Sequence, residues 1–296
     1  MQDVTDTPLP SLPPRAPESH KGDYGRLLLV GGSPGLAGAI GLAGMAALRS
    51  GAGLVTLLVP RSIQATVAGF EPSMMTLGMG AQSVGGEGVL RKEDAGAIRA
   101  AAQQATVVGL GPGLGRAAET VRLVHALYHH LRGPLVVDAD GLYGLAEQPT
   151  LLQSPAGPRV LTPHPGEFAR FTGQPVVAST GGRVEQAALL SRRDGQGGTI
   201  VVLKGHRTVI CDGRKYAVNA TGNPGMATGG TGDCLTGMIA ALIGQGLSPW
   251  DAARLGVHLH GLAGDRAAAA LGPVSMIASD LIRYLPAVFK ERCELG

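Results

Sequence analysis

A glycine-dense stretch from Gly222 to Gly237 constrains the fold more than any other feature of this chain. It holds six glycines and one proline in sixteen residues, and an apolar run of helical character, Leu235 to Ile243, follows at once. Such a composition predicts a loop that opens a helix, with the helix beginning near Asp233. The fold must therefore place an irregular, glycine-built loop directly in front of a buried helix.

The same stretch predicts the chemistry of a phosphate site. Gly229, Gly230 and Gly232 can take positive φ without a Cβ clash, so successive backbone N–H groups can point at one anion. The start of the helix adds unpaired N–H groups and the positive end of the helix dipole. We expect Asp233 to resist protonation in this field and to act as base for a hydroxyl beside the phosphate. The alternative is a plain turn capped by Asp233, which needs far fewer glycines.

Length and composition indicate a globular protein that packs with small residues. The chain has 296 residues and 47 glycines, and its aromatic content is only 3%. A net charge of +3 and few stacking side chains argue against nucleic acid as a partner. Cys211, Cys234 and Cys293 lack C-x-x-C spacing, so we expect small buried apolar residues or a loose terminal thiol, typical of the reducing cytoplasm.

The N-terminal region predicts neither a signal peptide nor a membrane span. Residues 1–20 are rich in proline, without a basic start or an apolar core, so we expect a flexible tail before a single domain at residues 21–296. The apolar stretch from Leu36 to Val59 is broken by Arg49 and by the turn at 50–53. It therefore predicts a buried helix, a turn and a strand, and no membrane partner.

Short apolar runs that alternate with longer helical stretches indicate an α/β fold with a mostly parallel sheet. The predicted strands lie at residues 26–30, 54–59, 74–77, 105–109, 134–138, 160–161 and 199–203, followed by a hairpin at 209–218. Helices are predicted at 117–131 and 250–272 and from residue 279 onward. In such folds ligands bind beyond the carboxyl ends of the strands.

Polar residues follow several of these strands. Asp138 and Asp140 come after one of them, and for Asp140 a turn or cap role is an equal alternative. His164 lies between two prolines, which suits a ligand contact, and Glu167 either satisfies a helix N-terminus or orients hydrated Mg²⁺. Residues 204–208 look like a nucleotide phosphate clamp, with a solvated hairpin tip as the alternative.

Two further glycine patterns suggest close approaches. Glycines at 35, 38, 41 and 44 leave one ridge of a predicted helix bare, and a neighbouring helix is expected at Gly41 and Gly44. A ligand approaching the turn is the expectation for residues 35–39. The loop at 109–115 has no G-x-G-x-x-G spacing, and the chain has no G-x-x-x-x-G-K-[ST] phosphate loop, so the site must use another geometry.

Together these blocks resemble the ADP-dependent NAD(P)H-hydrate dehydratases, a family of the ribokinase-like superfamily. The resemblance rests on the blocks at residues 22–25, 31–33, 109–115, 137–142, 161–167, 204–205, 222–237 and 278–281, in the family's order. It implies a three-layer α/β/α ribokinase-like fold with a mostly parallel central sheet. It also implies nicotinamide nucleotide repair: ADP-dependent dehydration of the S-form of hydrated NADH or NADPH, with release of AMP and phosphate.

The resemblance also implies roles for individual residues. Asp233 is the expected catalytic base, and the hydrated nicotinamide is expected to contact Ala39, Gly113, His164 and Asp233. The nucleotide is expected to contact Lys204, Gly205, His206, Arg207, Thr208, Gly230, Thr231 and Gly232. Glu167 keeps the acidic end of the superfamily's metal-organising N-x-x-E motif, whose amide His164 replaces, so Mg²⁺ is expected at Glu167.

Finally, the resemblance suggests a homo-oligomer, with a tetramer expected, and a separate polypeptide for any epimerase. Two alternatives share the glycine loop. One is a ribokinase-like kinase that stops at a stable phosphate ester. The other is a nucleotide-sensing or structural protein that has kept the fold without the chemistry.

Overall fold

The computed structural model describes residues 1–80, 88–195 and 198–294, of which residues 293 and 294 are described by their backbone alone. Its centre is one ten-stranded sheet. The strands are β1 (Gln2–Asp3), β2 (Arg26–Val30), β3 (Leu54–Pro60), β4 (Met75–Met79), β5 (Val107–Leu110), β6 (Leu135–Val137), β7 (Arg159–Leu161), β8 (Thr199–Leu203), β9 (Val209–Cys211) and β10 (Lys215–Val218). Their order across the sheet is β1-β10-β9-β8-β7-β6-β5-β2-β3-β4. Neighbouring strands are parallel except that β9 is antiparallel to both β8 and β10, so the mostly parallel sheet and the hairpin are confirmed.

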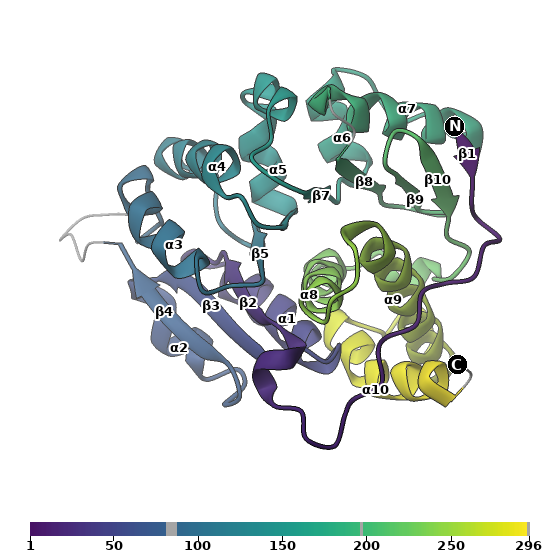
Figure 1. Cartoon of the computed structure of the whole chain (residues 1–296), viewed down its shortest axis with the longest axis horizontal. Coiled ribbons are helices and arrows are strands. Elements are labelled where there is room, and N and C mark those ends of the chain that lie inside the picture. The colour runs from purple at the N-terminus through teal and green to yellow at the C-terminus, as the bar shows by residue number, and fades with distance from the viewer. Residues whose placement is uncertain (81–87, 196–197, 295–296) are drawn as a thin grey trace.

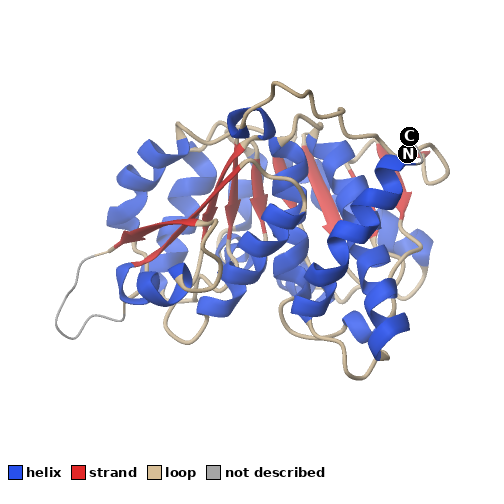
Figure 2. Ribbon diagram, turned by 90° about the horizontal axis from the view of Figure 1, so that it is seen from below, coloured by secondary structure: helices blue, strands red, loops and turns tan. Residues whose placement is uncertain are grey.

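Helices cover both faces of the sheet. They are α1 (Ala37–Arg49), α2 (Gln64–Ala68), α3 (Ala95–Ala102), α4 (Ala118–His130), α5 (Ala139–Ala146), α6 (Pro165–Thr172), α7 (Thr180–Ser191), α8 (Thr231–Gly244), α9 (Pro249–Leu271) and α10 (Ala278–Glu294). In Figure 1, α3 to α7 lie on one side of the sheet and α1, α2 and α8 to α10 on the other. Figure 2 shows the strands enclosed between the two helical layers, which confirms the three-layer α/β/α architecture.

The strand residues are apolar on both faces, because each face packs against a helical layer. In β2, Leu27 and Leu29 belong to the core under α1 and α8, whereas Leu28 and Val30 belong to the core under α4 and α5. The side chains alternate in this way because successive residues of a strand point to opposite faces. A continuous apolar run such as Arg26–Val30 is therefore the expected pattern for a central strand.

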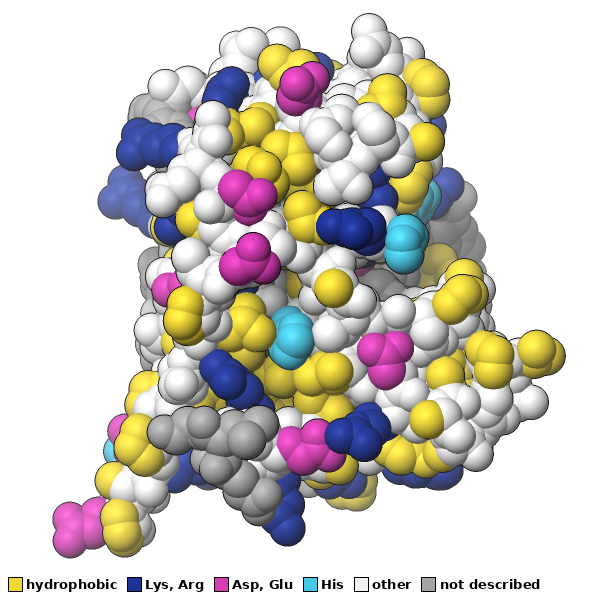
Figure 3. Space-filling model, turned by 90° about the vertical axis from the view of Figure 1, so that its right-hand side faces the viewer, with side chains coloured by type: hydrophobic (Ala, Val, Ile, Leu, Met, Phe, Trp, Pro, Cys, Tyr) yellow, Lys and Arg dark blue, Asp and Glu magenta, His cyan; other side chains and the backbone are white. Residues whose placement is uncertain are grey.

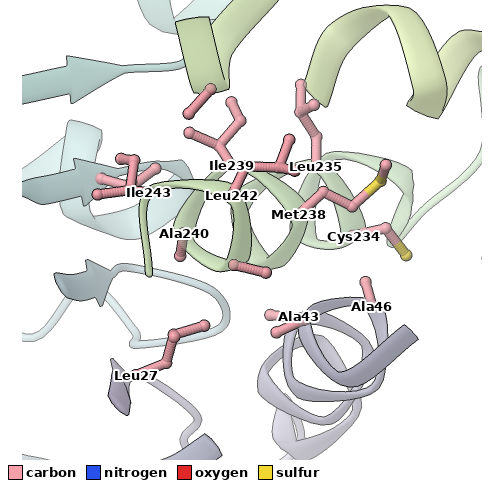
Figure 4. Packing of buried hydrophobic residues seen from close by; sticks show 14 of the residues in the cluster. Leu27, Ala43, Ala46, Cys234, Leu235, Met238, Ile239, Ala240, Leu242 and Ile243 are labelled. Atoms are coloured by element: carbon pink, nitrogen blue, oxygen red, sulfur yellow. The ribbon is translucent and has the colours of Figure 1, made fainter. Parts of the chain in front are cut away.

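Helix α8 is buried around its whole circumference. Figure 4 shows apolar side chains on opposite sides of it, with Ala43 and Ala46 of α1 below. A Cβ placed on Gly237 would lie 1.9 Å from the carbonyl oxygen of Ala43, so only glycine permits this close approach of α1 and α8. The expectation that a helix packs on Gly41 and Gly44 is wrong, because these glycines face the side chains of Phe70 and Met74.

The structure differs from the expected flexible tail at the start of the chain. Gln2 and Asp3 pair with β10 as β1, and Val4 is part of the core. The guanidinium of Arg254, which is buried, donates to the carbonyl oxygens of Val4 (3.3 Å) and Thr7 (2.8 Å). The edge of β10 and this buried cation both need hydrogen-bond partners, which the first residues provide.

Cys211 and Cys234 are buried and unpaired, as predicted, while the side chain of Cys293 lies outside the described residues. Within the described ranges, no helix has both the length and the apolar character needed to cross a membrane. Figure 3 shows acidic, basic and apolar side chains interspersed on the face near the N-terminus.

Candidate active site

The strand order reverses between β2 and β5, and this position holds the first wall of the site. β2 pairs with β3 on one side and with β5 on the other, so the loops after β2 and β5 lie side by side. The amide of Gly32 donates to the carbonyl oxygen of Pro112 at 2.8 Å, and the hydroxyl of Ser33 donates to that of Gly113 at 2.8 Å. Two loops that are 80 residues apart in sequence therefore form one surface at the carboxyl edge of the sheet.

Ala39 and Gly113, two of the expected substrate contacts, meet on this wall. A Cβ placed on Gly113 would lie 3.0 Å from the Cβ of Ala39 and 2.5 Å from the carbonyl oxygen of Leu36. Gly113 also has φ of 60°, which other residues rarely adopt, so the position requires glycine. Gly35 and Gly38 face open space, which agrees with the idea of a ligand approaching this turn.

The glycine loop opens α8 as predicted, and the helix begins at Thr231. Gly230 is its N-cap with φ of 92°, and no side chain caps the helix start. The first amides of α8 therefore remain available for an anion. Of the three glycines expected at positive φ, Gly230 alone adopts it, so the expectation is wrong for Gly229 and Gly232. Gly232 instead leaves room, because a Cβ there would lie 3.2 Å from Nζ of Lys204.

Lys204 lies at the centre of a buried charge network. Its Nζ donates to Oδ1 of Asp138 at 2.6 Å and lies 3.8 Å from Oε2 of Glu167. Oδ2 of Asp138 accepts a hydrogen bond from Oγ1 of Thr236, in α8, at 2.8 Å. The Asp138 side chain is 1% exposed and that of Lys204 18%, so Lys204 points into the protein and does not form a solvated hairpin tip.

Burial and pairing compete in setting the charges of this network. Burial opposes ionisation of Asp138, but the charge of Lys204 and hydrogen bonds from Lys204, Thr236 and Thr162 hold its pKa below the ordinary value. Burial likewise opposes the charge of Lys204, but Asp138 and Glu167 raise the pKa of its ammonium group. The pair is therefore ionised at neutral pH.

Asp233, the predicted base, lies half-buried in the first turn of α8. Burial and the negative charge of Asp138 raise its pKa to about 7, although Lys204 acts in the opposite direction. The expectation that Asp233 resists protonation is therefore wrong, because desolvation and a neighbouring carboxylate outweigh the loop amides and the helix dipole. A carboxylate with a pKa near neutrality is nevertheless well suited to accept a proton from a hydroxyl.

His164 and Glu167 close the start of α6. Nδ1 of His164 accepts hydrogen bonds from the amides of Gly166 (3.0 Å) and Glu167 (3.3 Å), and Oε2 of Glu167 accepts one from the amide of His164 (2.8 Å). Burial and the charge of Lys204 lower the pKa of His164, so its ring is neutral with Nδ1 as acceptor. Burial raises the pKa of Glu167 to about 7, with Lys204 opposing the shift and Asp138 adding to it.

Whether Mg²⁺ fits at Glu167 depends on the oxygen and nitrogen ligands around it. Among the described residues, no group of three or more His, Cys, Asp and Glu side chains is placed to hold a metal ion. One oxygen of Glu167 accepts from the His164 amide, and the other lies 3.4 Å from Nε2 of that residue. Mg²⁺ commonly keeps several waters and binds one or two carboxylates and substrate phosphates. The donor set is compatible only with an ion held through water, and a role of Glu167 toward Mg²⁺ stays a prediction.

Asp140, whose role the sequence left open, supports the loop after β5. Its Oδ2 accepts from the amide of Gly115 at 3.0 Å, and its Oδ1 from Nε of Arg116 at 2.8 Å. The guanidinium of Arg116 also lies 4.7 Å from the ring centre of Tyr143. Arg116 is not among the predicted site residues, although its place directly after the glycine loop was a signal.

Lys204 also lines a cavity of about 580 Å³. This volume is typical of ligand sites. Its lining includes the predicted residues 204–208, Thr231 and Gly232. It also includes residues that the sequence analysis missed: Asn219, Ala220, Thr221, Gly222, Asn223, Pro224, Met226, Ala227, Leu235, Val257, His260 and Gly261. Residues 219–221 could have been expected here, because they join the predicted hairpin directly to the glycine loop.

Arg183 of α7, also missed, holds the loop at residues 204–208 from behind. Its guanidinium donates to the carbonyl oxygens of Leu203 (3.0 Å), Lys204 (3.1 Å) and His206. The loop contains Arg207 at φ of 54°, a conformation that needs such support. No local sequence pattern distinguishes Arg183 from an ordinary helix residue.

The sheet order and the uncapped helix start beside a carboxylate define a ribokinase-like α/β protein, and solved structures agree. A ribokinase-like superfamily protein from Enterococcus faecalis V583 has a TM-score of 0.78 and 29% identity, covering 95% of this chain and 92% of its own. An ADP/ATP-dependent NAD(P)H-hydrate dehydratase from Bacillus subtilis, co-crystallized with ATP and Mg²⁺, has a TM-score of 0.78 and 32% identity over 95% and 94% of the two chains.

Sequence comparison gives the family. A family model described as NAD(P)H-hydrate dehydratase matches residues 27–287, and the chain belongs to this family. The bifunctional NAD(P)H-hydrate repair enzyme Nnr of Moorella thermoacetica is 47% identical over 281 residues, 94% of this chain and 52% of that protein. The enzyme of the same name from Escherichia coli K12 is 40% identical over 93% of this chain and 49% of its own length. The chain thus spans about half the length of the curated relatives it matches.

Proposed function

We propose that this chain catalyses the ADP-dependent dehydration of the S-form of hydrated NADH or NADPH, restoring the reduced cofactor and releasing AMP and phosphate. The observation that carries the proposal is the position of Asp233. It lies in the first turn of the uncapped helix α8, and its pKa responds to the charges of both Lys204 and Asp138. Lys204 and Gly232 also line the cavity of nucleotide size.

In the proposed reaction, the carboxylate of Asp233 accepts the proton of the hydroxyl at C6 of the hydrated ring. The oxygen attacks the terminal phosphorus of ADP, and the bond from that phosphorus to the AMP oxygen breaks. The original C6–O bond of this phosphate ester then breaks, phosphate leaves with the electron pair of that bond, and loss of the C5 proton to solvent restores the ring double bond. The amides of Gly230, Thr231 and Gly232 hold the phosphoryl group, which is charge stabilisation by preorganised donors.

The remaining residues position the two substrates. Ala39, Gly113 and His164 contact the hydrated nicotinamide, and residues 204–208 contact the nucleotide. The ion pair with Asp138 holds the Lys204 ammonium group beside Gly232, where a Cβ would lie 3.2 Å from its Nζ. Glu167 would be the residue that orients hydrated Mg²⁺, and the ion would supply neutralisation of phosphate charge.

The test supplies purified protein with hydrated NADPH and Mg²⁺, with either ADP or ATP, and follows reduced-nicotinamide absorbance and free phosphate together. We expect both signals to rise in step with ADP. A stable phosphate ester without phosphate release would replace the proposal by the kinase alternative. Nucleotide binding without any product would favour the sensing protein.

We also propose, from family likeness, a cytoplasmic homo-oligomer, a tetramer, in which residues 21–296 act as one domain. Light scattering of the purified chain tests the assembly. A monomer at working concentrations would contradict it.

A further inference from the structure

A second cavity lies at the opposite edge of the sheet from the candidate active site. It has a volume of about 560 Å³, close to the 580 Å³ of the cavity beside Lys204. Its lining includes Thr106 and Val107 where β5 begins, and Gly133 and Pro134 just before β6. The ends of α3 and α4, which Figure 1 shows near β5, form its other walls. We call this cavity the amino-edge groove.

Among the described residues that line the amino-edge groove are two arginines and no carboxylate. Arg99, His130 and Arg132 line it, and Gln103 and Thr106 add polar groups. Within the described part of the chain, neither guanidinium forms an ion pair or hydrogen bond: the structure gives no such contact for Arg99 or Arg132. Some exposed arginines elsewhere on this protein pair with carboxylates, as Arg122 does with Glu119 and Arg266 with Glu291.

A buried cation lies beneath the floor of the groove. Arg159 is fully buried and donates to the carbonyl oxygens of Tyr128 (2.9 Å), Leu131 (2.5 Å) and Gly133 (3.2 Å). Leu131 and Gly133 also line the groove. These carbonyls terminate α4, so Arg159 offsets the negative end of that helix dipole. Burial lowers the pKa of Arg159 to about 10, with Tyr128 acting in the opposite direction.

The groove therefore combines two unpaired guanidinium groups, a buried cation below them that is held by backbone carbonyls, and a volume sufficient for a ligand of drug or nucleotide size. Guanidinium groups bind phosphate oxygens in pairs of parallel hydrogen bonds, which gives both strength and geometry. The walls also include Ala100, Ala102 and Pro134, apolar surfaces that can cover the rest of a ligand.

We propose that the amino-edge groove is a second ligand site, which binds a phosphorylated small molecule of nucleotide size through Arg99 and Arg132. The site is separate from the one that carries the proposed function, so either proposal can fail alone. It lies at the beginnings of β5 and β6, whose far ends carry the glycine loop at 109–115 and Asp138.

The test is an amide-resolved NMR titration of the full chain with inorganic pyrophosphate, AMP and ADP. We expect saturable shifts of the Thr106 and Gly133 amides with ADP, and weaker ones with pyrophosphate. The double variant Arg99→Gln/Arg132→Gln should weaken ADP binding at these amides at least roughly tenfold, since two charge-assisted contacts are lost. Both positions are exposed, so the variant is expected to fold.

Arg122→Gln, on helix α4 but outside the lining of the groove, is the matched control and should leave the titration unchanged. Shifts confined to residues 204–208 and 230–232 would overturn the proposal, as would equal ADP affinity in the double variant. Binding of pyrophosphate without ADP at Thr106 and Gly133 would overturn the claim that the ligand is of nucleotide size.

Discussion

Two helices, α6 and α8, begin at the same edge of the sheet, and their first turns differ in one respect. Each has an acid at its third position, Glu167 in α6 and Asp233 in α8, and each acid has a pKa of about 7. In α6, His164 caps the helix and Glu167 accepts from the amide of His164. In α8, Gly230 provides no cap, and within the described residues no hydrogen bond to the Asp233 carboxylate is formed.

The first turn of a helix can therefore serve either a structural or a chemical purpose. The capping box of α6 satisfies the amides that would otherwise attract an anion. The open start of α8 leaves those amides and the adjacent carboxylate available to a ligand. The missing cap is therefore the reason to expect phosphate binding at the start of α8. The capped start of α6 lies beside that site and has its amides already satisfied.

The largest expected effect is that of Asp233→Asn. If Asp233 is the base, turnover should fall about 10²- to 10⁴-fold, because the amide cannot accept the proton. ADP affinity should change little, since the amides of α8 remain. Steady-state rates and calorimetric ADP binding check this. Asp251→Asn, in the first turn of α9, is the matched control, and full activity in Asp233→Asn would refute the assignment.

The pH dependence should distinguish the two acids. With Asp233 at a pKa of about 7, the rate at low substrate should rise about tenfold per pH unit below pH 6 and level off above 7. Glu167→Gln should leave this rise in place. The pKa of each of these two acids is higher in the folded protein than in the unfolded chain, so the protonated acids stabilise the fold. This stabilisation is complete below about pH 4 and is lost as pH rises through about 7. A rate independent of pH from 5 to 8 would exclude Asp233 as the base.

Lys204→Met should cause the largest loss of stability. It leaves the buried Asp138 carboxylate without its partner, which typically costs about 3–5 kcal/mol of unfolding free energy. Lys204→Met/Asp138→Asn should recover part of the loss, because no unpaired charge remains. Chemical denaturation measures both, with the exposed Lys92→Met as control. Equal stability of the single and double variants would show that the pair does not interact.

The features that could be predicted from the sequence are those set by residues close together in the chain. The strands, the glycine loop and the residues at 204–208 were predictable because apolar runs and glycines act locally. The pKa of Asp233 was not, because it depends on Asp138, which is 95 positions earlier in the sequence (233 − 138). Arg183 was missed for the same reason, since its carbonyl partners in β8 and the following loop become neighbours only in the folded sheet.

Gly230→Ala tests whether the open start of α8 depends on backbone conformation. A left-handed residue other than glycine costs roughly 1–2 kcal/mol, and the new Cβ would lie 2.5 Å from the Leu42 side chain. We expect lower stability and weaker ADP binding. Gly229→Ala is the matched control, because that position has open space and ordinary φ. If both variants bind ADP equally, the loop conformation does not hold the anion.

The smallest effect is expected at the start of α6. His164→Ala removes the cap and should cost about 0.5–2 kcal/mol of unfolding free energy. His164→Asn retains a capping side chain and should restore most of that stability. If His164 also contacts the hydrated nicotinamide, both variants should raise KM for that substrate equally, whatever their stability. A normal KM in His164→Asn would restrict His164 to its structural role, and α6 would then contribute only a closed helix start to the site.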